Sequence, residues 1–151
     1  MGVGDEAEPP SPLRYVAGGA DEHDAELDAL QVWDGAAWTE RAPMPRRRMD
    51  AACAAVGGRL VVLGGWVCGE GTTASVVAYD PRADAWSAAL APLPAPRAYF
   101  AAAADGEGRV VVVGDGPPLR FDDGEWRELP ALPCEGRAMA QGCVTGTVLL
   151  G

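Results

Sequence analysis

The residues best able to bind a metal ion or transfer a proton gather in one acidic segment near the amino terminus. His23, the single histidine of the chain, stands among Asp21, Glu22 and Asp24, and Asp28 follows four residues later. These carboxylates could attract calcium weakly, but the spacing and the central glycine of an EF-hand loop are absent. The segment therefore favours a solvated loop over a metal site, and we expect no cofactor.

The cysteines, serines and glycines do not form a catalytic pattern either. Cys53, Cys68, Cys134 and Cys143 show no C-x-x-C spacing, so the sequence predicts neither a zinc site nor a disulfide framework. Three of these cysteines fall in apolar stretches, where a free thiol acts as a small core residue. The serines lack the G-x-S-x-G setting of a nucleophile. We therefore predict a protein without enzyme activity.

The charge of the chain disfavours nucleic acid as a partner, and its hydropathy disfavours membranes. The formal net charge is −10; residues 1–40 carry ten acids and one arginine, and residues 41–151 carry twelve acids and eleven arginines. Without a broad cationic surface there is little counterion release to gain on a phosphate backbone. No apolar run approaches the ~20 residues of a membrane span. The start of the sequence lacks a secretory pattern, so we expect a cytoplasmic or nuclear protein.

A phrase that recurs along the chain indicates the fold that must position these residues. Trp86 has counterparts at Trp38 and Trp126, 48 residues before it and 40 residues after it. Such periods are typical of the four-stranded blades of β-propellers, whose repeats stack because one unit cannot bury its own apolar faces. The best copy of the phrase consists of Leu60–Leu63, Gly64-Gly65, Tyr79-Asp80, Trp86 and a proline-rich exit at 92–94.

The best copy predicts four antiparallel strands, at Ala51–Val56, Leu60–Leu63, Ser75–Tyr79 and Trp86–Leu90. The second strand is apolar throughout, which indicates that neighbouring blades cover both of its faces. The alanine-rich stretches fit inner strands near a propeller axis, although a buried helix could also produce them. Alternate connections of such a blade emerge on the same face, so the long charged connections should lie together.

We expect an all-β chain that forms a partial propeller. The predicted organisation is a disordered acidic tail at 1–12, a partial blade at 13–45, blades at 46–95 and 96–133, and a partial blade at 134–151. About three and a half blades would not close a ring of the usual size. The chain would then be a fragment, the product of a decayed gene, or a subunit that oligomerises to close the propeller.

The face with the long connections is the predicted partner-binding site, because binding residues usually lie on loops over a rigid scaffold. An alternative interpretation remains for the arginines that recur in register, which could instead hold the blades together, and for the acidic loop, which could be merely solvated. The candidate residues are Asp21, Glu22, His23, Asp24, Arg46, Arg47, Arg48, Trp66, Arg97 and Arg137.

The order of arginine, apolar run, Gly-Gly, aromatic-Asp, tryptophan and proline-rich exit resembles the kelch repeat of β-propeller proteins. Trp33-Asp34 is superficially similar to the WD40 dipeptide. Its counterparts Tyr79-Asp80 and Phe121-Asp122, however, show that the constant feature is an aromatic residue before aspartate, and no Gly-His pair precedes it. The kelch repeat is therefore favoured.

The first unit resembles a narrower group, the plant F-box/kelch proteins, through the phrase V-A-G-G-A-D-E at 16–22. Members of that group dock on an SCF ubiquitin ligase through an F-box and hold the substrate with the propeller. Some of them target enzymes of phenylpropanoid synthesis or hormone-response regulators. The resemblance implies a protein-interaction module that recognises a protein substrate. Residues 1–12 are too few for an F-box, so docking on the SCF scaffold would need a box outside this chain.

Two other functions remain open. The chain could be an inert kelch fragment without a stable partner. It could also be similar to propeller oxidases, but these need copper ligands, typically histidine and tyrosine from several blades, and this chain has one histidine. The protein-interaction module is the favoured interpretation.

Overall fold

The computed structural model describes residues 13–88 and 90–133, which form thirteen strands and no helix. The expected tail at 1–12 and the expected partial blade at 134–151, with Arg137, lie outside these residues. The prediction of an all-β chain is confirmed. The strands are β1 (Arg14–Ala17), β2 (Leu30–Trp33), β3 (Trp38–Arg41), β4 (Ala52–Val56), β5 (Arg59–Leu63), β6 (Trp66–Val67), β7 (Gly71–Thr72), β8 (Val76–Asp80), β9 (Ala85–Ser87), β10 (Ala101–Ala104), β11 (Val110–Val113), β12 (Leu119–Asp122) and β13 (Glu125–Glu128).

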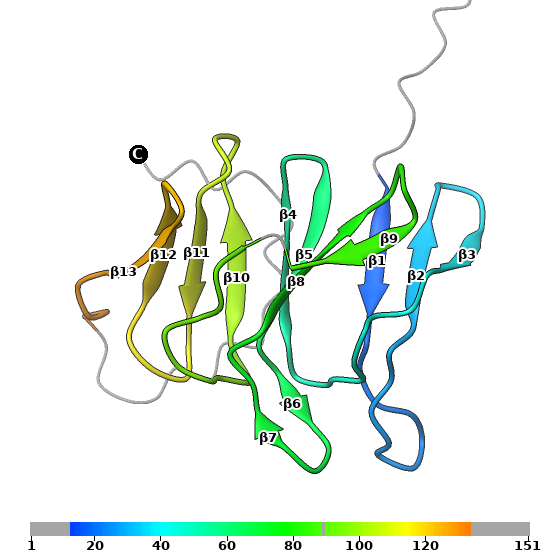
Figure 1. Ribbon diagram of the computed structural model, residues 1–151, viewed down its shortest axis with the longest axis horizontal. Coiled ribbons are helices and arrows are strands. Elements are labelled where there is room, and N and C mark those ends of the chain that lie inside the picture. The colour runs from blue at the N-terminus through cyan, green and yellow to red at the C-terminus, as the bar shows by residue number, and fades with distance from the viewer. Residues whose placement is uncertain (1–12, 89, 134–151) are drawn as a thin grey trace, which may run out of the picture.

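Three antiparallel sheets lie side by side in chain order, as Figure 1 shows. We call them blade I (β1-β2-β3), blade II (β4-β5-β8-β9) and blade III (β10-β11-β12-β13). A small hairpin, β6–β7, is inserted between β5 and β8. Within the described ranges there is no helix with the length and apolar character needed to cross a membrane.

The second strand of blade II is covered on both faces, as its apolar sequence predicts. Leu60 and Val62 pack toward blade I, whereas Val61 and Leu63 pack toward blade III, and each is at most 5% exposed. β4 pairs with β5 along its whole length, so this alanine-rich stretch is an inner strand and not a helix. Residues 57–58 close the hairpin with the positive φ that glycine accepts.

The fourth strand of blade II is shorter than the sequence suggests. The prediction was Trp86–Leu90, but β9 ends at Ser87. The chain then leaves the sheet and turns back over the blade, where the amide of Leu93 donates to the carbonyl of Ala74 at 2.8 Å. The Leu93 side chain is 4% exposed in the core between blades II and III. Burial of this leucine draws the exit segment away from the sheet.

The core is divided into two clusters, one in each junction between blades. Blade II contributes to both, because alternate residues of its strands point to opposite faces. Its face toward blade I meets Leu30, Val32 and Met44, and its face toward blade III meets Val110, Val112 and Phe121. The apolar contact between neighbours, rather than any single blade, holds the fold together.

In blades II and III, a tryptophan joins the outer part of the blade to the preceding link. The indole Nε1 of Trp86 donates to the carbonyl of Ala42 at 2.7 Å, and that of Trp126 donates to the carbonyl of Ala91 at 2.9 Å. These bonds cross from one repeat into the next over 44 and 35 residues of sequence. The recurring tryptophan thus has the same role in both junctions.

The junction of blades I and II has a further polar contact. The phenol of Tyr79 donates to Oδ1 of Asp84 at 2.8 Å, and the same oxygen accepts the amide of Ala42 at 2.9 Å. Burial, followed by the bond to the carboxylate, raises the pKa of Tyr79 to about 12. Phe121 takes the corresponding place in blade III, so the apolar part of the ring suffices for the blade fold.

We predict that Tyr79→Phe lowers the free energy of unfolding by about 1 kcal/mol at neutral pH, since one hydrogen bond is lost without a cavity. The raised pKa means that the neutral phenol favours the fold: its contribution is complete below the ordinary pKa of 10.0 and is lost as pH rises toward about 12. Urea unfolding from pH 7 to 12 checks both effects, with wild type declining more steeply than the variant above pH 10. Parallel declines would contradict the assignment.

Candidate partner-binding face

The long connections lie together at one end of the blades, which we call the loop face (Figure 1, lower end). It is formed by the connection from β1 to β2, the connection from β5 to β8 with its hairpin, the short connection from β11 to β12, and the two links between blades. The tight turns lie at the opposite end. This arrangement follows from the antiparallel order of the strands and agrees with the expectation from the sequence.

Two arginines that recur in register lie beneath the loop face. Arg48 donates through Nη1 to the carbonyl of Gly64 at 2.9 Å and through Nη2 to the hydroxyl of Ser75 at 2.9 Å. One blade later, Arg97 donates through Nη1 to the carbonyl of Gly114 at 3.1 Å. Each guanidinium therefore binds the carbonyl at the end of the second strand of its own blade.

The same arginines bind the preceding blade through their main chain. The carbonyl of Arg48 accepts the amide of Gly19 at 3.0 Å, and the carbonyl of Arg97 accepts the amide of Gly65 at 2.9 Å. The approach is so close that a Cβ on Gly64 would lie 2.5 Å from the Arg97 carbonyl oxygen. The Gly-Gly pair is needed because the link of the next blade lies against it.

The prediction that Arg48 and Arg97 contact a partner is corrected by their burial. Their exposed fractions are 1% and 3%, so neither guanidinium reaches the surface. Burial also lowers the pKa of both groups. Their hydrogen bonds to main-chain carbonyls agree with the alternative interpretation, in which recurring arginines hold the blades together. Arg137 is outside the described residues.

The other two arginines of the first link are at the surface. Arg46 forms an ion pair with Glu70 of the β6–β7 turn, and both side chains are about half exposed, at 48% and 50%. Arg47 is exposed. The ion pair connects the link before blade II to the inserted hairpin, and it places a charged pair on the loop face.

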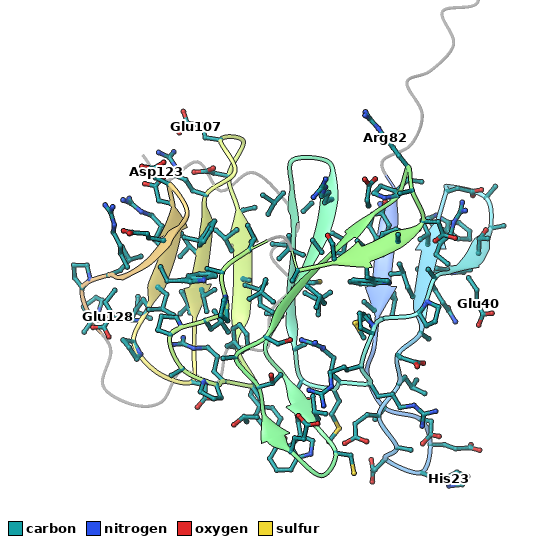
Figure 2. The ribbon with its side chains drawn as sticks, in the orientation of Figure 1. His23, Glu40, Arg82, Glu107, Asp123 and Glu128 are labelled. Carbon is teal, nitrogen blue, oxygen red and sulfur yellow. The ribbon has the colours of Figure 1, made fainter. Side chains whose placement is uncertain are left out.

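The acidic residues of the β1–β2 connection form their own turn. Oδ1 of Asp21 accepts the amides of His23 at 2.8 Å and Ala25 at 3.0 Å, and these bonds lower the pKa of Asp21. Glu22 and Asp24 are exposed, and Asp24 has a φ of 59°. Figure 2 shows His23 at the tip of this connection. The carboxylate of Asp21 thus has a structural role, and its neighbours point to solvent.

Trp66 is the predicted aromatic contact, and its position is fixed. It forms a bridge with Met49, in which the Trp66 amide donates to the Met49 carbonyl at 2.8 Å and the Met49 amide donates back at 3.1 Å. The indole lies against Gly71, since a Cβ added to this glycine would be 3.9 Å from the nearest indole carbon. The side chain is nevertheless 40% exposed. Trp66 therefore presents a large apolar surface from a held backbone.

Tyr99 is a second exposed aromatic residue on this face, and the sequence reasoning missed it. It is 46% exposed and has a φ of 55°, a left-handed conformation that is uncommon for a bulky residue. Its amide donates to the carbonyl of Asp50 at 3.0 Å. The Asp50 carboxylate, by its charge and by a hydrogen bond to the phenol, raises the pKa of Tyr99. The only signal in the sequence was its place two residues after Arg97.

In the part of the chain that the structure describes, no three histidine, cysteine or acidic side chains gather as metal ligands would. The chemistry of the loop face is therefore that of exposed aromatic rings, hydrogen-bonding carboxylates and two surface arginines. Such a surface suits contact with another macromolecule. The absence of enzyme activity stays a prediction.

Comparisons with known proteins agree with the blade geometry. Residues 47–89, which include all four strands of blade II, match the kelch motif. Kelch-like protein 34 from Homo sapiens is 37% identical over 118 residues, which is 76% of this chain and 18% of the human protein. Residues 47–89 thus match one kelch motif, and the chain spans less than a fifth of the length of that relative.

A solved structure shows the same fold. The structure of YjhT superposes with a TM-score of 0.62 and 20% sequence identity, over 83% of this chain and 54% of the YjhT chain. At this identity the likeness shows the fold alone, and the prediction of an all-β partial propeller built of antiparallel blades is confirmed. These comparisons do not distinguish plant F-box/kelch proteins from other kelch proteins, so the resemblance to that group stays a prediction.

The close approach at the Gly-Gly pair gives a matched test with two glycines. Gly64 and Gly57 have nearly equal φ, 59° and 56°, but only Gly64 has a main-chain neighbour at the Cβ position. We predict that Gly57→Ala lowers the unfolding free energy by about 1 kcal/mol, the cost of a left-handed alanine. Gly64→Ala should cost at least about 2 kcal/mol more, because the Arg97 carbonyl must move. Equal losses in urea unfolding would refute the role of the contact.

Proposed function

We propose that this chain is a protein-interaction module whose loop face binds a protein partner. The observation that carries the proposal is the pair Trp66 and Tyr99, which are 40% and 46% exposed on a face where the scaffold beneath is buried and hydrogen-bonded. Tryptophan and tyrosine are the residues most enriched among the side chains that dominate binding energy in protein interfaces. The kelch motif and the similarity to a Kelch-like protein support the same function.

The anchoring of both aromatic residues favours binding. The main chain of Trp66 is hydrogen-bonded to that of Met49, and the amide of Tyr99 donates to the carbonyl of Asp50. Met49 and Asp50 are consecutive residues of the link before blade II. Both backbones are thus fixed before a partner arrives, which reduces the conformational entropy lost on association. Arg46, held by Glu70, and the exposed Arg47 add polar groups at the edge.

The finer proposal concerns the kind of partner. Because the phrase at 16–22 resembles plant F-box/kelch proteins, we propose that the loop face holds a protein substrate for an SCF-type ubiquitin ligase, with the F-box supplied outside this chain. A cytoplasmic or nuclear location, the absence of a cofactor and the absence of catalysis belong to the same proposal. The net charge of −10 favours partners with a basic surface, since opposite charge speeds encounter.

Photo-crosslinking tests the loop face directly. A crosslinking amino acid at position 66 or 99 should capture the same protein from a cell extract, and the same amino acid at Arg82, at the opposite end of the blades (Figure 2), should not. With the captured protein purified, Trp66→Ala and Tyr99→Ala should each weaken binding about tenfold or more, while Arg82→Ala leaves it unchanged. Unchanged affinity in both aromatic variants would remove the loop face from consideration.

The SCF part of the proposal has a separate test. The purified chain should not bind the scaffold protein that recognises F-boxes, because no part of its sequence is assigned to an F-box, whereas the chain fused to an F-box should bind it. Co-precipitation of the scaffold with the unfused chain, resistant to Trp66→Ala, would contradict this division of roles.

A further inference from the structure

The side chains of Asp50 and Tyr99 meet where two consecutive links between blades lie side by side. Asp50 follows Arg48 by two residues, and Tyr99 follows Arg97 by two residues, so both hold the same place in the repeat. Both have a left-handed φ, of 54° and 55°. The amide of Tyr99 donates to the carbonyl of Asp50 at 3.0 Å, and the phenol donates to the Asp50 carboxylate. One aromatic ring and one carboxylate are thus joined on the loop face.

The Asp50 carboxylate has no cationic partner among the described residues, where none of the ion pairs includes it. An ionised carboxylate offers about four lone-pair sites, and the neutral phenol of Tyr99 uses one of them. Asp50 is also partly buried. Because a partly buried charge is less well screened by water, a cation gains more here than on a fully solvated aspartate.

The loop face as a whole carries an excess of negative charge. In the part of the chain that the structure describes, its connections contain four arginines and eight acidic residues, which are Asp21, Glu22, Asp24, Glu26, Asp28, Asp50, Glu70 and Asp115. Three of the arginines are already engaged: Arg46 pairs with Glu70, and the buried Arg48 and Arg97 donate to main-chain carbonyls. A surface of this kind attracts cationic segments.

A second carboxylate lies close to Tyr99 and adds to the local negative charge. Oδ2 of Asp115, in the short connection from β11 to β12, accepts the amide of Ala98 at 3.0 Å, and Ala98 immediately precedes Tyr99. Asp115 is exposed. The buried guanidinium of Arg97 partly balances its charge. Asp50 is therefore the carboxylate better placed to pair with a cation from a partner.

The ring of Tyr99 supplies the second part of a cation site. It is 46% exposed, and its main chain is held by the bond to Asp50. A guanidinium can stack on an aromatic ring while its planar fork of donors binds a carboxylate, a combination that the compact ammonium group of lysine does not match. The chain already contains one such contact, since the guanidinium carbon of Arg97 lies 5.9 Å from the centroid of the Phe100 ring.

We propose that Tyr99 and Asp50 bind an arginine side chain of the protein partner, with the guanidinium stacked on the phenol ring and hydrogen-bonded to the carboxylate. The phenol keeps its bond to one carboxylate oxygen, and the guanidinium binds the other. This arginine site rests on the proposed loop-face function and gives the partner a chemistry: an exposed arginine in a basic segment. Trp66 is bonded to Met49, the residue before Asp50, so the indole is placed to contact apolar residues beside that arginine.

A short peptide tests the arginine site before any partner is identified. The probe is the tripeptide acetyl-Ala-Arg-Ala-amide, titrated into the full nitrogen-15-labelled chain while the amide resonances are followed by NMR. It should bind in the millimolar range and shift the amide of Tyr99. The lysine analogue should bind at least about threefold more weakly, and the glutamate analogue should leave the spectrum unchanged. Equal affinity for the arginine and lysine peptides, or no shift at Tyr99, would overturn the proposal.

Matched variants separate the site from the general charge of the face. Asp50→Asn should weaken binding of the arginine peptide about tenfold. Glu22→Gln removes one exposed acid from the same face and should change the affinity by less than about twofold. Tyr99→Phe keeps the ring and should retain most of the binding, whereas Tyr99→Leu should lose it. Equal losses in Asp50→Asn and Glu22→Gln would refute a defined site. Thermal melting checks that each variant is folded.

The partner captured by crosslinking distinguishes failure of this site from failure of the proposed function. Against the purified partner, Asp50→Asn should weaken binding about tenfold, in addition to the loss expected for Trp66→Ala. If Trp66→Ala weakens binding and Asp50→Asn does not, the loop face still binds the partner and the arginine site is wrong. Unchanged affinity in both variants would overturn the loop-face function and the arginine site together.

Discussion

The other features of the structure depend on the hydrogen bonds of a buried arginine in each link between blades. Its guanidinium binds the following blade, and its main-chain carbonyl binds the preceding blade. The guanidinium of Arg97 donates to the carbonyl of Gly114, at the end of β11. The main-chain carbonyl of the same arginine accepts the amide of Gly65 in blade II. Taking a guanidinium out of water is costly unless its donors find acceptors. Main-chain carbonyls at a strand end, which have no further sheet partner, are such acceptors. Arg48 repeats the arrangement one blade earlier, so both junctions are held near the loop face by the same device.

The outer tryptophans secure each blade at a second point. Trp86 and Trp126 bond to carbonyls of the preceding link, and their rings complete the apolar contact between neighbours. The arginine contact near the loop face and the tryptophan contact from the fourth strand together fix the angle between two neighbouring sheets. With both held, the connections can vary without disturbing the blades, which explains how a hairpin of two short strands fits between β5 and β8.

The sequence predicts the fold better than the site, for a physical reason. Strand positions follow from local patterns, such as the unbroken apolar run of β5 and the glycines at 57–58, and these patterns lie within a few residues of each other. Whether Arg48 or Arg97 reaches solvent depends on carbonyls 16 and 17 residues away, which no local pattern reveals. Tyr99 was missed because its exposure results from a left-handed φ that aligns it with Asp50 of the neighbouring link.

The exposed aromatic residues occupy two kinds of position on the scaffold. Trp66 and Tyr99 lie on the loop face, held by main-chain bonds to residues 49–50, whereas Trp38 lies opposite Trp33 on the side of blade I that faces away from blade II. The main chains of Trp66 and Tyr99 are held by hydrogen bonds, so their rings are positioned before a partner binds. Trp38 pairs with Trp33 as Trp86 pairs with Tyr79 in blade II, so its place is set by the repeat. Its exposure is therefore a poor guide to partner choice, and exposed hydrophobic residues become informative only after each has been assigned to a loop or to the side of a blade.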